Sequence, residues 1–274
     1  MPVAPDPIEI MDSPTNAYPC HINPDISPEQ FIPDHIFIHM IAGTMTVFDR
    51  NNAYHLNPGD YCLAKRNHLA RYIKRAPENG KFESVALFFD QNFLRSFSKE
   101  YDWSTDHTAS KDAVVKLDPN PWFESYIRSL TPYRKLKTTA YDDILSLKNK
   151  EIVLILLKTN PDLKNILFDF SDPGKLDLEL FMNQNYRFNV SLERFAYLSG
   201  RSITTFKRDF EKVFNTSPGR WLLEKRLQEA YFLIDKKGQR PSDVYLQVGF
   251  EDLSHFSFAF KKLHGVAPSS LVKA

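Results

Sequence analysis

The 274-residue chain has little cysteine, little glycine and no long apolar run. Its two cysteines, Cys20 and Cys62, form no CxxC motif, which favours reduced thiols in a cytosolic compartment. The longest aliphatic run, Ile152 to Leu157, is far shorter than the ~18 residues of a membrane span. The acidic, proline-rich N-terminal segment lacks the basic and apolar regions of a signal peptide. These absences predict a cytoplasmic protein with no membrane contact.

Motifs of common enzyme classes are also missing: the sequence has no glycine-rich phosphate loop and no GxSxG nucleophile elbow. Its length and 42% hydrophobic content can supply two domain cores. The net charge of +1 hides a difference between the two ends of the chain. Residues 176–274 hold 15 Lys and Arg against 11 Asp and Glu, an excess that suits local contacts with phosphate groups.

The C-terminal third contains two successive helix-turn-helix signatures. The first, SLERFAYLSGRSITTFKRDFEKVF, spans Ser191 to Phe214. Ser191 can cap a short helix, Gly200 can end it at positive φ, and Ser202 can cap the next helix. At roughly 100° per residue, that next helix has one apolar side and one polar, basic side. The apolar side holds Ile203, Phe206, Phe210, Val213 and Phe214, and the polar side holds Thr204, Thr205, Arg208 and Lys212.

The second signature, Ser242 to His264, repeats this organisation. Pro241 suits a first helical position, Gly249 a helix stop and Asp252 a cap, and Gly265 ends the last helix. An amphipathic segment, Gly219 to Asp235, connects the two units. Its apolar residues could pack against both units, so that one helix fixes the distance between them; they are Trp221, Leu222, Leu227, Ala230 and Ile234.

This pattern resembles the DNA-binding domain of the AraC/XylS family of bacterial transcription regulators over residues 176–274. The strongest segment is VGFEDLSHFSFAFKKLHGVAPSSL, whose residues fall in the order typical of that family: Gly249-Phe250, Ser254, Phe256, Phe260-Lys261-Lys262, Gly265-Val266 and Pro268. The resemblance implies that Ser202–Phe214 and Leu253–His264 are recognition helices. They would enter neighbouring major-groove segments of double-stranded DNA about one helical turn apart.

The resemblance also indicates which side chains reach DNA. By position, Thr204, Lys207 and Arg208 match the usual contacts of the first helix, and Leu253, Ser254 and Phe258 match those of the second. With the polar outer faces added, the predicted DNA-binding residues are Thr204, Thr205, Lys207, Arg208, Lys212, Leu253, Ser254, His255, Phe258 and Lys262.

Phe258 departs from the family pattern, which usually has a basic or polar side chain at this position. It lies ~150° from the centre of the predicted apolar face, so we expect it to be exposed. That face comprises Leu253, Phe256, Ala259, Phe260 and Leu263. An exposed phenylalanine could pack on a thymine methyl group. It could equally contact the N-terminal domain or a second copy of the chain.

Residues 30–90 alternate short apolar runs with turn signals, which favours a β-sandwich or barrel. Beside the C-terminal match, this half looks like the cupin-type barrel common in the family. Its aromatic residues could line a barrel mouth or form plain core; they are Phe37, Phe48, Tyr54, Tyr61, Tyr72, Phe82, Phe88 and Phe89. Effector binding and a scaffold for docking and dimerisation remain alternatives, and no effector-binding residue is assigned.

The histidines of this half do not form a metal-binding pattern. His35 and His39 would share one face of a strand, but the HxH pair and following glutamate of metal cupins are missing. His55 and His68 stand alone. We therefore expect structural or surface roles for these histidines, no metal, no cofactor and no catalytic residue.

Three helical segments follow: Gln91–Lys99 capped by Asp90, Trp122–Leu130 opened by Asn120-Pro121, and Tyr141–Lys158. The run Ile152–Leu157 is apolar all round, which predicts burial against the barrel and, in part, against a partner helix. In the family, helices after the barrel commonly mediate dimerisation. The sequence thus predicts an α+β fold with a cupin-like β-barrel at 1–118, a helical dimerisation segment at 119–170, and an AraC-type DNA-binding domain at 176–274.

The leading hypothesis is a cytoplasmic, nucleoid-associated, homodimeric transcription regulator that binds specific DNA. RNA polymerase and a small-molecule or protein effector are further partners of this class. A cupin-type enzyme or carbohydrate-binding protein is the main alternative, and the missing ligand cluster argues against it. A third hypothesis is an interaction module that has lost DNA binding, which Leu253 and Phe258 would suit.

Overall fold

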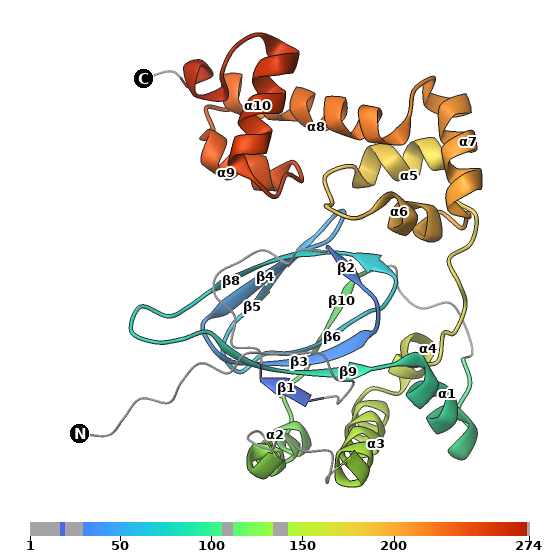
Figure 1. Ribbon diagram of the computed structural model, residues 1–274. Coiled ribbons are helices and arrows are strands. Elements are labelled where there is room, and N and C mark those ends of the chain that lie inside the picture. The colour runs from blue at the N-terminus through green and yellow to red at the C-terminus, as the bar shows by residue number, and fades with distance from the viewer. Residues whose placement is uncertain (1–16, 20–29, 106–111, 134–141, 273–274) are drawn as a thin grey trace.

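The computed structural model describes residues 17–19, 30–105, 112–133 and 142–272 (Figure 1). Cys20, Tyr141 and most of the proline-rich N-terminal segment lie outside these ranges. Within them, the N-terminal part is rich in strands and the C-terminal part is helical. The predicted α+β class is therefore confirmed.

The strands form two main sheets and one short ribbon, all antiparallel. The five-stranded sheet has the order β1-β9-β3-β6-β10, the three-stranded sheet has the order β5-β4-β8, and β2 pairs with β7. The described strands thus face one another as in a cupin-like barrel without closing one continuous sheet. Their bounds are β1 (Ala17–Pro19), β2 (Phe31–Ile32), β3 (His35–Ala42), β4 (Thr44–Phe48), β5 (Ala53–Leu56), β6 (Tyr61–Ala64), β7 (His68–Leu69), β8 (Arg71–Arg75), β9 (Glu83–Phe89) and β10 (Val114–Leu117).

Both faces of the five-stranded sheet are buried. Side chains alternate along a strand, so Phe37 and Leu63 enter one apolar cluster while Cys62 and Met40 enter another. The second cluster lies between the sheets and includes Met45 of β4. Six of the eight aromatic residues named from the sequence are divided between the two clusters: Phe37, Tyr61 and Phe89 face the helices, whereas Tyr54, Tyr72 and Phe82 lie between the sheets.

Helices cover the face of the five-stranded sheet that points away from the three-stranded sheet (Figure 1). Asp90 and Asn120 cap the first two of them, as the sequence predicts, by accepting backbone N–H groups. The helices are α1 (Gln91–Glu100), α2 (Pro121–Ser129), α3 (Asp142–Thr159) and α4 (Lys164–Leu167), with short 3-10 turns η1 (Thr131–Tyr133) and η3 (Pro161–Leu163).

The apolar run of α3 belongs to this core. Ile152, Val153, Leu156 and Leu157 are buried, while Leu154 and Ile155 are half-buried against the same cluster. Most of this run is therefore buried against the core of the chain itself, as the sequence predicts in part, and contact of the half-buried residues with a partner helix stays a prediction. Exposed apolar side chains of α3 lie nearer its start, at Ile144 and Leu147.

The C-terminal domain contains two helix-turn-helix units on a central helix. The units are α6 (Leu192–Leu198) with α7 (Ile203–Phe214), and α9 (Pro241–Gln247) with α10 (Leu253–His264). They pack at opposite ends of α8 (Pro218–Asp235), and α5 (Leu178–Asn185) and η4 (Pro268–Leu271) complete the domain (Figure 1). No described helix is both long and apolar enough to cross a membrane.

The central helix packs against both units, as the sequence predicts. Trp221 and Leu222 join the core of the first unit, whereas Leu227, Ala230 and Ile234 join the core of the second. Because α8 is one continuous helix, it links the two cores at a defined separation.

Candidate nucleic-acid interface

Capping side chains begin both candidate reading helices at the predicted residues. The Ser202 hydroxyl accepts the Thr205 N–H at 3.3 Å at the start of α7. The Asp252 carboxylate accepts the His255 N–H at 2.6 Å at the start of α10. These contacts fix the first turn of each helix, which is the turn whose side chains reach base edges in helix-turn-helix proteins.

A glycine permits close backbone packing in the turn of each unit. Gly200 has φ +68°, and a Cβ there would lie 2.5 Å from the Gly174 carbonyl oxygen. Gly249 has φ +94°, and its Cβ would lie 2.6 Å from the carbonyl oxygen of Arg187. Neither position has room for a side chain, so each turn is pressed directly against another segment of backbone.

The outer face of α7, the first candidate reading helix or first reader, brings together most of the residues predicted to contact DNA from this helix. Thr204, Lys207, Arg208 and Lys212 are exposed, and the Arg208 side chain is 66% exposed. Thr205 is half-buried, and its hydroxyl accepts a hydrogen bond from the Ser202 cap at 3.0 Å.

Burial on α7 differs from the sequence prediction at one position. Val213 is 42% exposed rather than buried, because the core of this unit ends at Phe210 and Phe214. Arg201, just before α7, holds this helix to the rest of the domain. Its Nε lies 3.2 Å from Asp209 Oδ2, and its Nη1 donates to the Leu176 carbonyl at 3.0 Å. The hydrogen bond from Arg201 to the Asp209 carboxylate, together with the positive charges of Arg208 and Arg201, holds the pKa of Asp209 below its usual range.

The outer face of α10 carries Ser254 and Phe258, with His255 and Lys262 exposed on its flank. Phe258 is 70% exposed, so the described residues leave most of its side chain uncovered. Lys261 lies on the same face, three residues after Phe258, and the sequence prediction omitted it.

Two leucines that the sequence assigned to the apolar face of α10 are about two-fifths exposed. Leu253 is 39% exposed and Leu263 is 44% exposed, whereas Phe256 and Phe260 are fully buried. The buried row is therefore shorter than the helical wheel indicates, because the core cluster of this unit includes Phe256 and Phe260 and neither terminal leucine.

The N-terminal domain contacts the first helix-turn-helix unit through the β2–β7 ribbon. Phe31 and Leu69 join the core cluster of that unit. The Arg194 guanidinium of α6 lies 3.9 Å from the centre of the Phe31 ring. These contacts are non-local, and no sequence signal predicted them.

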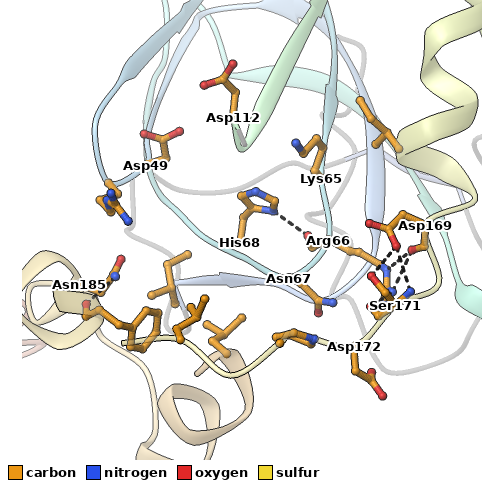
Figure 2. A pocket seen from close by; sticks show the side chains of 18 of the residues that line it. Asp49, Lys65, Arg66, Asn67, His68, Asp112, Asp169, Ser171, Asp172 and Asn185 are labelled. Atoms are coloured by element: carbon orange, nitrogen blue, oxygen red, sulfur yellow. Dashed lines mark hydrogen bonds between the residues drawn. The ribbon is translucent and has the colours of Figure 1, made fainter. Parts of the chain in front are cut away.

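A cleft of about 530 Å³ lies beside this contact, between the ends of the strands, α5 and the linker, residues 169–174, that joins the two domains (Figure 2). Arg66 points to the linker and donates to the carbonyl oxygens of Asp169 at 3.0 Å and Ser171 at 2.8 Å. Lys65, Asp49 and Asp112 approach the cleft from the strand-rich part of the N-terminal domain, residues 1–118, which we call the β-domain (Figure 2). Charges of both signs line this space.

The histidines of the β-domain lie apart in separate environments. His35 is buried and its Nδ1 accepts the Arg66 N–H at 3.4 Å, while His39 stacks on Tyr61 at 4.2 Å. His55 bonds to Thr46, and His68 bonds to the Arg66 carbonyl. Within the described residues, no group of three or more His, Cys, Asp or Glu side chains could hold a metal ion.

Two helix-turn-helix units with capped, outward-facing second helices define a DNA-binding regulator with a separate N-terminal domain. Comparison with known proteins gives the family. Residues 35–166 match the ExsA N-terminal regulatory domain, and residues 196–274 match a helix-turn-helix domain family.

The chain also matches individual relatives over most of their length. The chain is 33% identical over 231 residues to the thermoregulatory protein LcrF of Yersinia pestis, covering 83% of this chain and 82% of LcrF. It is 23% identical over 233 residues to the HTH-type transcriptional regulator ExsA of Pseudomonas aeruginosa, covering 84% and 83%. A crystal structure of apo ToxT from Vibrio cholerae aligns with 16% identity and a TM-score of 0.44, covering 94% and 95%.

The chain therefore belongs to the AraC family of transcription regulators, with an N-terminal regulatory domain and a C-terminal DNA-binding domain. The relatives named here are transcription regulators rather than enzymes.

Proposed function

We propose that this regulator reads two neighbouring major-groove segments of an operator, the first with α7 and the second with α10. The observation that carries the proposal is the outward, N-terminally capped face of each helix at opposite ends of one connecting helix. We propose the ten residues predicted from the sequence as the DNA contacts and add Lys261.

Selection of binding sites from random DNA by the full chain, followed by footprinting, tests this function. Two protected major-groove segments about one helical turn apart are expected on the selected operator. Failure to enrich any sequence, or protection of a single segment, would contradict the two-reader function.

We further propose three functional segments: residues 1–118 as the regulatory β-domain, 119–170 as the dimerisation segment and 176–274 as the DNA reader. The relative VirF of Yersinia enterocolitica, 33% identical over 238 residues, is named a virulence regulon transcriptional activator. This name supports the proposal that the protein activates transcription through RNA polymerase. Because it would bind operator DNA, we place it in the cytoplasm. A small-molecule or protein effector would act through the N-terminal segments.

The homodimer surface that we propose lies on α2 and α3. Trp122 is 56% exposed, Leu147 is 64% exposed and Ile144 is 38% exposed. The two helices contact each other, and Ile144 and Leu147 lie three residues apart on one face of α3. A second copy would remove this apolar area from water.

Leu147→Glu is expected to weaken self-association at least roughly tenfold, or about 1.4 kcal/mol, because it places a charge in an apolar contact. Sedimentation over a concentration series measures the change. Leu180→Glu, at a 56% exposed leucine on α5, is the matched control and should leave self-association unchanged. Equal behaviour of the two variants would remove Leu147 from the interface.

Phe258→Ala should weaken binding to operators that have thymine at the contacted position. Replacing that thymine with uracil removes one methyl group and should cost about 0.8 kcal/mol, roughly fourfold. The alanine variant should then no longer distinguish thymine from uracil. Phe232→Ala, at a 46% exposed phenylalanine of α8, is the control. If the variant still distinguishes the two bases, Phe258 does not contact the methyl group.

A further inference from the structure

The loop between α5 and α6, residues 186–190, is held by a buried arginine of the central helix. Arg226 donates from Nε to the Tyr186 carbonyl at 2.8 Å and from Nη2 to the Phe188 carbonyl at 2.8 Å. Its remaining nitrogen, Nη1, donates to the Gly249 carbonyl at 3.0 Å. One guanidinium therefore ties the loop that precedes the first unit to the turn of the second unit.

The chemistry of this clamp requires arginine. Burial lowers the pKa of Arg226 to about 10, and the side chain stays charged at neutral pH. Its three carbonyl partners lie in different directions, which suits the rigid planar fork of a guanidinium. A lysine ammonium on a flexible stem could not hold all three at these positions.

The same loop contacts the segment just before the second reader. The side-chain amide of Asn189 donates to the carboxylate of Glu251. Glu251 directly precedes Asp252, whose carboxylate caps α10. The Gly249 turn also packs against the Arg187 backbone with no room for a Cβ. A shift of the loop would therefore be passed to the start of α10.

On its other side, the loop is bonded to the N-terminal domain. The Gln30 side-chain oxygen accepts the Asn189 N–H at 3.0 Å, and the Gln30 N–H donates to the Asn189 carbonyl at 3.2 Å. Gln30 is only 3% exposed, and its own carbonyl accepts the Ala70 N–H at 3.0 Å within the β-domain. The β-domain thus holds the loop at a backbone position rather than through mobile surface side chains.

We propose that the 186–190 loop is the element through which the N-terminal domain sets the position of the second reading helix. Gln30, Asn189 and Arg226 are its positioning residues. They touch no DNA and act by fixing where α10 stands relative to α7. The inference rests on the proposed two-helix reading of the operator and adds the device that determines its spacing.

The spacing of the operator reports on this device. One base pair inserted between the two contact segments moves the second by about 3.4 Å along the axis and turns it by about 35°. A firmly positioned α10 cannot follow both changes, so affinity falls sharply. A loosened α10 can adjust, and the fall becomes smaller.

The experiment compares full-length proteins on the selected operator and on versions with one base pair inserted or deleted between the two segments. We expect the ratio of affinities, best spacing over altered spacing, to fall at least threefold in Gln30→Ala and in Asn189→Ala. Arg226→Lys should lower it further. Asn92→Ala, at an exposed asparagine of α1, is the control and should keep the wild-type ratio.

A merely structural role would lower affinity equally for all three spacings and leave the ratio unchanged. That result in both Gln30→Ala and Asn189→Ala, with the proteins still folded by circular dichroism, would overturn the proposal. A wild-type protein that selects no operator would instead contradict the two-reader function, and the positioning role would fall with it.

Discussion

Arg208→Ala should weaken binding to the selected operator by about 1–3 kcal/mol, roughly 5- to 150-fold, and leave binding to random DNA almost unchanged. Arg208 occupies the centre of the exposed face of α7, one turn after Thr204. Asp209 competes weakly for its guanidinium, since the closest approach is 3.5 Å and Arg201 holds that carboxylate more closely. The Arg208 guanidinium is therefore available for a bidentate contact with guanine.

Lys212→Ala is the matched comparison, because it removes a positive charge from the same helix one turn later. We expect it to weaken specific and random DNA alike and to lower the salt dependence of binding by about one phosphate contact. Fluorescence anisotropy at several salt concentrations, on the operator and on random DNA, separates the two effects. If Arg208→Ala weakened both DNAs equally, Arg208 would be a phosphate contact and not a base reader.

Local signals in the sequence were sufficient to place the reading helices. Ser202 and Asp252 cap them, and Gly249 marks the turn of the second unit, because capping and positive φ depend on residues within one or two turns. The apolar residues of α8 likewise divide between the two units as predicted. These features need no knowledge of distant contacts.

Helix ends were less well predicted than helix centres. The wheel places Leu253, Leu263 and Val213 on apolar faces, yet each is about two-fifths exposed. A wheel gives the direction of a side chain and says nothing about whether another helix extends far enough to cover it. The exposed leucines of α10 therefore became visible only in the assembled domain.

Contacts between segments distant in sequence had no local signal. Gln30 and Asn189 are 159 residues apart, and no motif relates them. In the sequence, Arg226 is one of several charged residues on an amphipathic helix. In the structure, its guanidinium donates hydrogen bonds to three carbonyl oxygens. The apolar run of α3 has the same limit: Ile155 is half-buried against the core cluster of the N-terminal domain, and an apolar helix face does not specify what covers it.

Acid should destabilise the N-terminal domain through His35, by about 2 kcal/mol at pH 5 relative to pH 7.5. Burial lowers the pKa of His35 to about 3 from an ordinary value of 6.5. Arg66, His68 and Lys65 add to this shift, and Asp169 opposes it. The folded protein thus favours the neutral ring. The stability that the neutral His35 ring contributes is fully present above pH 6.5, and it is lost as the pH falls from there towards 3.

His35→Asn removes the titrating ring but keeps an acceptor for the Arg66 N–H, so its stability should depend less on pH over this range. Urea unfolding followed by tryptophan fluorescence measures the difference. In a Trp221→Phe background, the remaining tryptophans, Trp103 and Trp122, both report on the N-terminal domain. His55→Asn, at an exposed histidine, should retain the wild-type profile. Parallel stability curves for the wild type and His35→Asn between pH 7.5 and 5 would show that the buried imidazole does not cause the acid sensitivity.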